Sequence, residues 1–585
     1  MVIIMIYCSI NEHRIENNGI RVEFGECSSN IFSTLCIITA SFPSSSRSSH
    51  TMFAQMSMAI HNAVHAFPMT KSELYVYASI VIFVVLWCRM RWQYRQFYRL
   101  ADKIKGPPTY PLKGSIFDLS TTPEKIMYNF KESAEKYNYE PVKLWVGPFL
   151  FVGVYKPEDV QIVLNSSKAL EKGIIYHIIR HAVGEGVFTA PIGKWKKHRR
   201  IIASIFSSKF LDQLYPIFNE NNKKLVENIS KHIGETQPFD IWDYIISCNL
   251  NNVSQAAMGY NLNDKRTLSE FVLAMKKVSE LSKCIVKPWL YIDQIFAVHT
   301  YLTGLNVYMS QLNRVSLQII RDKKLELKST RLQQFTDKSY EVVPEKNKNS
   351  TKVFLDKLLK LNDEGADFTD EDLKDEVITM TVAGSDTSAI SECFCILLLA
   401  MHPDIQDKVY DEIYSVLGES DREVIPEDIF RFKYLEMVLK ESLRLFPPGA
   451  IFSRKINENV KLTNFELPKG SNVFVSPYVT HRCPQLYPNP DTFNPENFNA
   501  ENEANRHKFS FLAFSGGPRG CLGVKYAMIS MKLMMVAVLR RYSVHTDCKL
   551  SEIEMKIDLL AKKADGYPIT IRPRKRTQDQ TMTIV

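Results

Sequence analysis

The sequence predicts a mainly α-helical fold with small β-sheets, arranged as a single large domain behind one N-terminal membrane helix. Three observations support this. Long stretches such as residues 370–401 have the pattern of helices, no internal repeat divides the chain, and residues 74–88 form an uncharged apolar run. A chain of 585 residues can hold several domains. A hydrophobic content of 45% with 33 phenylalanines is nevertheless ample for one large core.

Composition excludes some classes of protein. The net charge of +9 is not gathered into dense basic blocks with interleaved aromatic residues, so we expect no nucleic-acid partner. Eleven cysteines, without the paired spacings of disulfides or metal sites, indicate a reducing compartment. Cys393 and Cys395 lie in an apolar helical pattern and are expected in the core. Only residues 323–352 are polar enough to be predicted as an interior loop between helices.

The first 68 residues do not fit this plan. They contain two short apolar runs and a serine-rich stretch, and acidic residues such as Glu12 and Glu23 argue against a mitochondrial transit peptide. We expect residues 1–68 to be an upstream extension of the reading frame, a gene-model artefact, or a disordered tail.

Residues 69–92 are expected to form the membrane anchor. The apolar run within them is shorter than the roughly 20 residues that span a bilayer core, but Lys71, Arg89 and Arg91 can extend its reach by snorkelling. The competing interpretation is a signal peptide, yet no small-residue cleavage site follows the run. Because positive charge marks the cytosolic side of a membrane helix, we expect the following domain to face the cytosol.

The anchor is followed by a basic, proline-rich segment, residues 93–114, which contains Lys105-Gly106-Pro107-Pro108. Prolines stiffen the exit from a helix, so this segment is predicted to be a hinge. The main domain is expected over residues 115–573, and residues 574–585 should form a polar tail.

A long helix is predicted over residues 370–401. Thr369 is a plausible N-cap, acidic residues fill the first turn, and His402-Pro403 ends the pattern. Gly384 lies in the middle, where glycine costs roughly 1 kcal/mol relative to alanine. We expect a functional reason for that cost.

A glycine-rich loop, Phe514-Ser-Gly-Gly-Pro-Arg-Gly-Cys-Leu-Gly523, presents Cys521 before a predicted helix. Such a loop is what haem iron needs if a thiolate is to hold it. A free thiol is mostly protonated near neutral pH, since its pKa is roughly 8.5. We expect Arg519, the loop N–H groups and the helix N-terminus to favour the anion. The alternative is a glycine-rich turn with a buried cysteine of no special role.

This loop, with the pattern F-x-x-G-x-R-x-C-x-G, resembles the haem-binding loop of the cytochrome P450 superfamily. Three other stretches resemble its motifs in the same order: G-K-W-K-K-H-R at 193–199, A-G-S-D-T-S at 383–388, and E-S-L-R at 441–444. Together with H-R-C-P-Q-L-Y-P-N-P at 481–490, the loop is most similar to the family-4 clan of animals and insects. The resemblance implies the cytochrome P450 fold, with residues 115–573 as a haem-thiolate catalytic domain.

The resemblance also implies the site residues. Cys521 would ligate the iron of haem b, and Thr387 and Asp386 would organise proton delivery beside Gly384, where the family's helix opens locally. The alternative is that Thr387 bonds back to its own helix and Asp386 is solvated. The other haem-binding residues implied are Trp195, Arg199, Arg454, Phe514 and Arg519.

The chain departs from the family pattern at two positions. Asn497 stands where the family has an arginine that joins the Glu441–Arg444 pair, and His481-Arg482 or a water are the open replacements. Ala383 stands where many family-4 members carry a glutamate esterified to haem, so covalent attachment through that position is excluded.

The implied function is a monooxygenase that inserts one oxygen atom from O2 into an apolar substrate, such as a fatty acid, a hormone-like lipid or a xenobiotic. Electrons would come from NADPH through NADPH-cytochrome P450 reductase, with cytochrome b5 as an optional donor, at the endoplasmic reticulum membrane. Lys194, Lys196, Lys197 and Arg200 form either a docking face for the donor or a solvated surface. Two alternatives stay open: a haem-thiolate isomerase or dehydratase without a reductase, and a non-catalytic haem-binding protein.

Overall fold

The structure is a computed structural model that describes residues 71–109, 114–115, 124–259, 265–285, 287–336 and 353–574. The segment predicted as an extension, residues 1–68, and nearly all of the predicted tail lie outside these residues. The chain divides between Gln93 and Tyr94 into two compact units, which are described separately.

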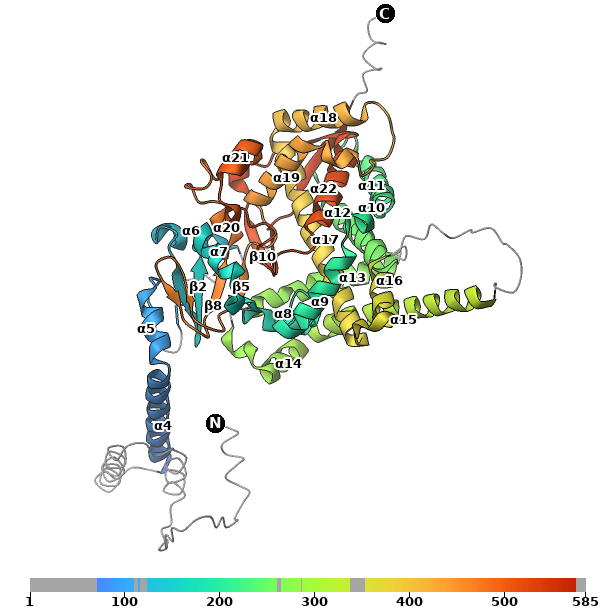
Figure 1. Cartoon of the computed structure of the whole chain (residues 1–585). Helices are drawn as coiled ribbons and strands as arrows, with labels where there is room; N and C mark the ends of the chain where they lie inside the picture. Colours follow the sequence, from blue (N-terminus) through green and yellow to red (C-terminus); the bar gives the residue numbers. More distant parts are fainter. Residues whose placement is uncertain are drawn as a thin grey trace, which may run out of the picture. The chain divides into compact units, whose positions relative to one another are not determined.

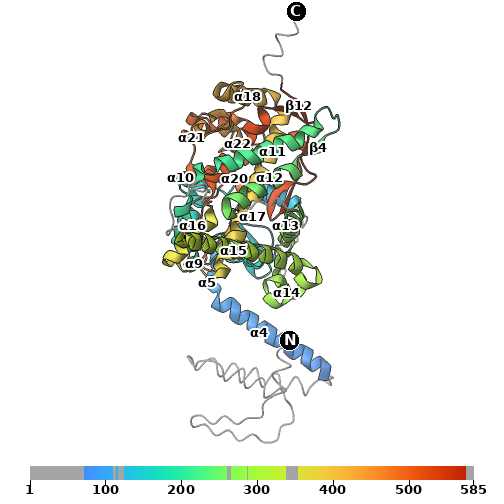
Figure 2. The same cartoon turned by 90° about the vertical axis from the view of Figure 1, so that its right-hand side faces the viewer.

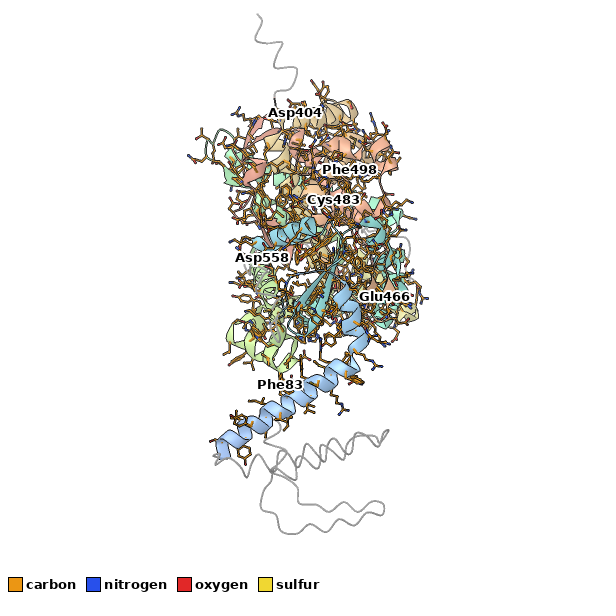
Figure 3. The ribbon with its side chains drawn as sticks, turned by 90° about the vertical axis from the view of Figure 1, so that its left-hand side faces the viewer. Phe83, Asp404, Glu466, Cys483, Phe498 and Asp558 are labelled. Carbon is orange, nitrogen blue, oxygen red and sulfur yellow. The ribbon has the colours of Figure 1, made fainter. Side chains whose placement is uncertain are left out.

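The first unit contains one described helix, α4 (Lys71–Gln93). Its 23 residues give a length of about 35 Å, more than the ~30 Å hydrocarbon core of a bilayer. Large apolar side chains such as Phe83, labelled in Figure 3, are exposed along it. Among the described residues, α4 and α17 are long and apolar enough to cross a membrane, and α17 is mostly buried inside the second unit. The helix α4 is therefore the candidate for a membrane span.

The second unit is mainly helical, with small sheets, as the sequence predicts. Its helices are α5 (Arg95–Lys103), α6 (Lys125–Lys136), α7 (Pro157–Asn165), α8 (Ile175–Val183), α9 (Ile192–Ile205), α10 (Ser208–Asp212), α11 (Tyr215–Ile229), α12 (Trp242–Val253), α13 (Lys265–Val278), α14 (Asp293–Leu302), α15 (Leu305–Thr336), α16 (Phe354–Leu361), α17 (Asp370–Met401), α18 (Pro403–Leu417), α19 (Lys433–Leu445), α20 (Pro477–Thr480), α21 (Ala500–Asn505) and α22 (Val524–Leu539).

The strands are short. They are β1 (Val142–Val146), β2 (Phe149–Val154), β3 (Glu171–Lys172), β4 (Phe239–Asp240), β5 (Phe452–Lys455), β6 (Val460–Lys461), β7 (Glu466–Leu467), β8 (Asn472–Val475), β9 (Tyr542–His545), β10 (Met555–Asp558), β11 (Leu560–Lys563) and β12 (Pro568–Pro573).

The largest sheet has the strand order β1-β2-β8-β5-β3, and only its β2–β8 pair is parallel. Figure 1 shows it at one side of the second unit, near α6 and α7, while α17 runs through the helical part. The helices α12 and α15 pack against α17 (Figure 2), and α22 and α19 pack against it as well. Most of α17 is buried, so this helix is the centre of the core.

The predicted helix over residues 370–401 is confirmed in both bounds. The Thr369 hydroxyl accepts a hydrogen bond from the N–H of Asp372, and the Asp372 carboxylate accepts one from the N–H of Thr369, which is a capping box. The helix ends before His402-Pro403. The motifs around Trp195 and Glu441 lie in the helices α9 and α19.

The loop predicted for residues 323–352 is wrong in its first part, because α15 continues as a helix to Thr336. Polarity misleads here because a helix that lies on a surface can be polar around much of its circumference. The rest of that stretch lies outside the described residues. The predicted hinge, residues 93–114, contains the helix α5, whose Ala101 is buried. The domain boundaries themselves stay predictions.

Candidate active site

One large cavity, with a volume of about 1510 Å³, lies inside the second unit. Its walls are mostly apolar and come in part from residues 172–192 and 211–308. The β10–β11 hairpin and Phe474 of β8 also line it, which the sequence did not indicate. All eight predicted site residues line this one cavity: Trp195, Arg199, Asp386, Thr387, Arg454, Phe514, Arg519 and Cys521.

Cys521 is held at the cavity by a tight loop before α22. Its backbone N–H donates to the carbonyl of Phe514 at 2.9 Å, and the N–H of Gly520 donates to Gly517 at 2.9 Å. Gly517 has φ of +64°, and a Cβ there would lie 2.2 Å from the Leu164 carbonyl oxygen. Any other residue would therefore push the loop off its neighbour. The Cys521 side chain is open to the cavity that it lines, while the surrounding protein encloses it and keeps it from bulk solvent.

The expected electrostatics of Cys521 are only partly correct. Burial raises the pKa of the thiol, while the N–H of Gly523 and the charge of Arg199 lower it. The effect of burial is the largest, so the pKa of the thiol is raised overall and the free thiol keeps its proton. Arg519, the cation that we expected to act, points elsewhere, as described next. Because metal binding displaces a proton from a thiol, the anion is expected only when a cation is ligated.

Arg519 is buried beside Trp195, with its guanidinium 4.2 Å from the centre of the indole ring. Its Nε donates to the Leu170 carbonyl at 3.1 Å, and its Nη2 donates to the Ala190 carbonyl at 2.8 Å. Its Nη1 is buried and has no hydrogen-bond partner among the described residues. A guanidinium with one donor free at a cavity is suited to an anion.

Lys172 is a site residue that the sequence analysis missed. It lies opposite Arg454 in the β3–β5 pair. Like charges placed opposite one another destabilise a sheet. Burial and the charges of Arg454 and Arg519 hold the pKa of Lys172 well below its usual range. Burial and Arg454 likewise lower the pKa of Arg519 to about 10.

Four cationic side chains line the cavity, with fewer carboxylates nearby to pair with them. They are Lys172, Arg199, Arg454 and Arg519. Glu171 is the carboxylate that acts on Arg519. Buried charge is costly unless it is paired, so the cluster fits a ligand with more than one negative charge. A flat group with two carboxylates and a metal for Cys521 meets both requirements, and haem is such a group.

Thr387 and Asp386 lie on α17 at the cavity. The helix is continuous through Gly384, and the Thr387 hydroxyl donates to the Ala383 carbonyl at 2.6 Å. The expected local opening of the helix is therefore not present, and Thr387 has the back-bonded arrangement. Packing explains why glycine stands at position 384, because a Cβ there would lie 2.9 Å from Cγ2 of Val253 on α12.

Asp386 is half-buried rather than solvated. Burial raises the pKa of its carboxyl to about 6, while the nearby charge of Lys562 lowers it. Lys562 pairs with Asp558 at 3.2 Å on the β10–β11 hairpin, and Asp558 is labelled in Figure 3. A carboxyl with this pKa exchanges protons readily near neutral pH.

The Glu441–Arg444 pair on α19 is completely buried, each residue being 0% exposed. Arg444 Nε donates to Glu441 Oε2 at 2.7 Å, and Nη2 donates to Oε1 at 2.8 Å. The guanidinium also donates to the carbonyls of His481, Pro490 and Thr492. The pair therefore ties α19 to the segment of residues 481–492.

Asn497 itself takes the place of the missing arginine in the network around Glu441. Its side-chain amide donates to Glu441 Oε1 at 3.1 Å, and the N–H of Asn494 donates to the same oxygen at 2.9 Å. His481 contributes its backbone carbonyl, while Arg482 Nε donates to Asp491 instead. Phe498, labelled in Figure 3, follows Asn497 and is buried. The replacement for the missing arginine is thus an amide hydrogen bond.

The basic face predicted on α9 is smaller than expected. Lys194 lies 2.6 Å from Asp372 of α17, and Lys197 lies 3.1 Å from Asp367. Lys196 and Arg200 are exposed. Carboxylates distant in the sequence neutralise half of the face, which a single helical pattern cannot show.

Glu392 lies on α17 beyond the cavity and was not singled out by the sequence. It is completely buried, and its carboxyl accepts a hydrogen bond from the Asn249 side chain. Its other oxygen has no partner among the described residues. Burial raises the pKa of Glu392 from 4.5 to about 8, although the Asn249 bond lowers it. The carboxyl is thus neutral in the folded protein near pH 7.

Glu392→Gln is expected to reduce the loss of stability at high pH. Between pH 4.5 and about 8 the unfolded chain loses this proton while the folded chain keeps it. Parent stability therefore falls as the pH rises through this range, by up to about 1.4 kcal/mol per unit. Glutamine cannot ionise, so urea unfolding at pH 5 and pH 8 should show a smaller loss for the variant. The exposed Glu227→Gln is the control, and a loss unchanged by Glu392→Gln would contradict the assignment.

Comparisons with known proteins agree with this geometry. The sequence model of the family described as cytochrome P450 matches residues 104–570. Cytochrome P450 4V2 of Homo sapiens is 32% identical over 475 residues, which cover 80% of this chain and 89% of that protein. Cytochrome P450 4c21 of Blattella germanica is 32% identical, covering 81% and 94%. Cytochrome P450 4g15 of Drosophila melanogaster is 28% identical, covering 85% and 96%.

Among solved structures, the crystal structure of the cytochrome P450DA heme domain matches with a TM-score of 0.68. The match covers 81% of this chain and 98% of that domain at 20% sequence identity, and it shows the shared fold.

Proposed function

Because the chain belongs to the cytochrome P450 family, in which a haem-thiolate monooxygenase is the common activity, we propose that it oxidises an apolar lipid or xenobiotic with electrons from NADPH. The observation that carries this proposal is the single cavity that brings together Cys521, a cluster of buried cations, and the Asp386–Thr387 pair. Its mostly apolar walls suit a substrate such as a fatty acid, a hormone-like lipid or a foreign compound.

The proposed haem site is made of Cys521 and the cations that line the cavity. Cys521 would hold the iron of haem b, and Arg454, Arg519, Lys172 and Arg199 would bind the propionates. The free Nη1 of Arg519 is the donor most directly suited to a carboxylate. Bound haem supplies the O2 chemistry, while the protein supplies the ligand, the pocket and the protons.

Proton delivery would be the task of Asp386 and Thr387. A carboxyl with a pKa of about 6 can give up a proton and regain it near neutral pH. The Thr387 hydroxyl now donates to Ala383 and has to rotate before it can donate into the cavity. An isomerase, which needs no proton relay, could also have a Thr387 hydroxyl bonded to Ala383. A substitution of Thr387 therefore distinguishes the monooxygenase from the isomerase.

We place the protein at the endoplasmic reticulum membrane, anchored by α4, with the second unit in the cytosol. Arg89 and Arg91, at the C-terminal end of α4, support this orientation. NADPH-cytochrome P450 reductase is the proposed electron donor, with cytochrome b5 as an optional one. The exposed Lys196 and Arg200 of α9 can attract an acidic partner.

Thr387→Ala is expected to lower the ratio of product formed to NADPH consumed. Removing one positioned proton donor typically costs about 10²–10⁴-fold in rate, although a water can recover part of that loss. Electrons would then leave as hydrogen peroxide. The ratio should be measured in the reconstituted enzyme with its reductase, for a substrate that perturbs the haem spectrum.

Thr381→Ala is the matched control. Its hydroxyl makes the same kind of bond, to the Val377 carbonyl at 2.8 Å, but Thr381 does not line the cavity. The ratio of product formed to NADPH consumed should be the same in Thr381→Ala as in the parent. Turnover that needs no NADPH and is indifferent to Thr387 would instead establish the isomerase.

A further inference from the structure

Two histidines and an aspartate converge outside the cavity, on the outer surface of its wall. His177 and His181 are four residues apart on α8, and Asp293 is the first residue of α14. His177 Nε2 lies 2.8 Å from Asp293 Oδ1, and His181 Nε2 lies 3.3 Å from the same oxygen. All three ligand atoms lie within 4.8 Å of one another. Figure 1 shows α14 close to α8.

These distances suit a metal ion. Zinc binds histidine nitrogen and carboxylate oxygen at about 2.0–2.2 Å, so two of its ligand atoms at a tetrahedral angle lie roughly 3.4 Å apart. The His181 distance of 3.3 Å is near that value, and the His177 distance of 2.8 Å would have to widen by about 0.6 Å. Residues four apart on a helix present their side chains side by side. Two imidazoles and one carboxylate leave one position for water, as in many zinc sites.

The ring of His181 is already held in place by a neighbouring side chain. The His181 ring stacks on Phe296 at 4.6 Å, which fixes its direction.

We propose that His177, His181 and Asp293 form a binding site for a divalent transition metal such as zinc, which fastens α8 to α14. The opposite face of α8 carries Ile175, Tyr176 and Ile179 into the cavity lining, and Ile292, next to Asp293, lines it as well. A bound metal therefore joins two parts of the cavity wall and slows the passage of apolar ligands between them.

Zinc binding is tested with the full chain, produced without a histidine tag and dialysed against buffered Zn²⁺. One zinc per chain is expected. Asp293→Asn and His181→Ala should each lower the affinity for zinc by at least about tenfold. Even the mutation of a residue that only orients a metal ligand typically lowers metal affinity by about 10–100-fold. Both positions are solvent-exposed, so the variants should keep the parent's thermal unfolding temperature.

His232→Ala is the matched control. His232 Nδ1 lies 2.6 Å from Glu235, so it is another histidine–carboxylate pair, and it should not affect zinc binding. Equal zinc binding by the parent, Asp293→Asn and His181→Ala would overturn the proposal.

The link to the cavity has its own measurement. The rate at which a fluorescent apolar ligand leaves the protein should fall when Zn²⁺ is added to the parent, and this response should be lost in His181→Ala. The measurement does not depend on turnover, so a failed monooxygenase assignment leaves it intact. A release rate that zinc does not change would show that the metal does not fasten the wall.

Discussion

Replacing Arg444 with leucine is expected to remove most of the folded, haem-loaded protein. The substitution leaves the Glu441 carboxylate buried without its cation, and breaking a buried pair in this way typically costs about 3–5 kcal/mol. The carbonyls of His481, Pro490 and Thr492 lose their donors as well. Because an unpaired buried polar group costs about 1–3 kcal/mol, the sum is comparable to the 5–15 kcal/mol that stabilises a typical native protein.

The measurements for Arg444→Leu are the yield of haem per purified chain and the midpoint of urea unfolding. Lys440→Leu is the control on the same helix. Lys440 lies 2.9 Å from Glu503 and 3.2 Å from Glu436, at a surface where such pairs contribute about 0–1 kcal/mol. The Lys440→Leu variant should keep the haem content of the parent. If Arg444→Leu folds and loads haem as the control does, the buried network does not hold the segment after α20 in place.

The parts of the molecule that the sequence predicts well are those fixed by neighbouring residues. The bounds of α17 follow from Thr369, Asp372 and Pro403, which act within one turn of the helix ends. The loop around Cys521 is equally local, since its glycines and its cysteine lie within ten residues. The eight site residues are far apart in the chain, and their meeting at one cavity follows from the family resemblance of the motifs that carry them.

The parts that the sequence does not predict depend on contacts between distant segments. Lys172 is a site residue only because β3 pairs with β5, which places it opposite Arg454. Gly384 is required by Val253 of another helix, and no pattern within residues 370–401 contains that information. The effect of burial on Cys521 has the same origin, because the depth of a side chain is set by the whole fold.

The central claim is that Cys521 gives a thiolate to haem iron in this cavity. The most direct measurement is the absorption spectrum of the reduced protein under carbon monoxide, because a thiolate ligand pushes electron density to the iron and shifts the main band to longer wavelength. The parent should show this shifted band. Cys521→His should lose it even where haem stays bound, since imidazole offers no thiolate. Cys548→His, at a cysteine that does not line the cavity, should keep the parent spectrum. A shifted band that persists in Cys521→His would place the sulfur ligand elsewhere and contradict the account.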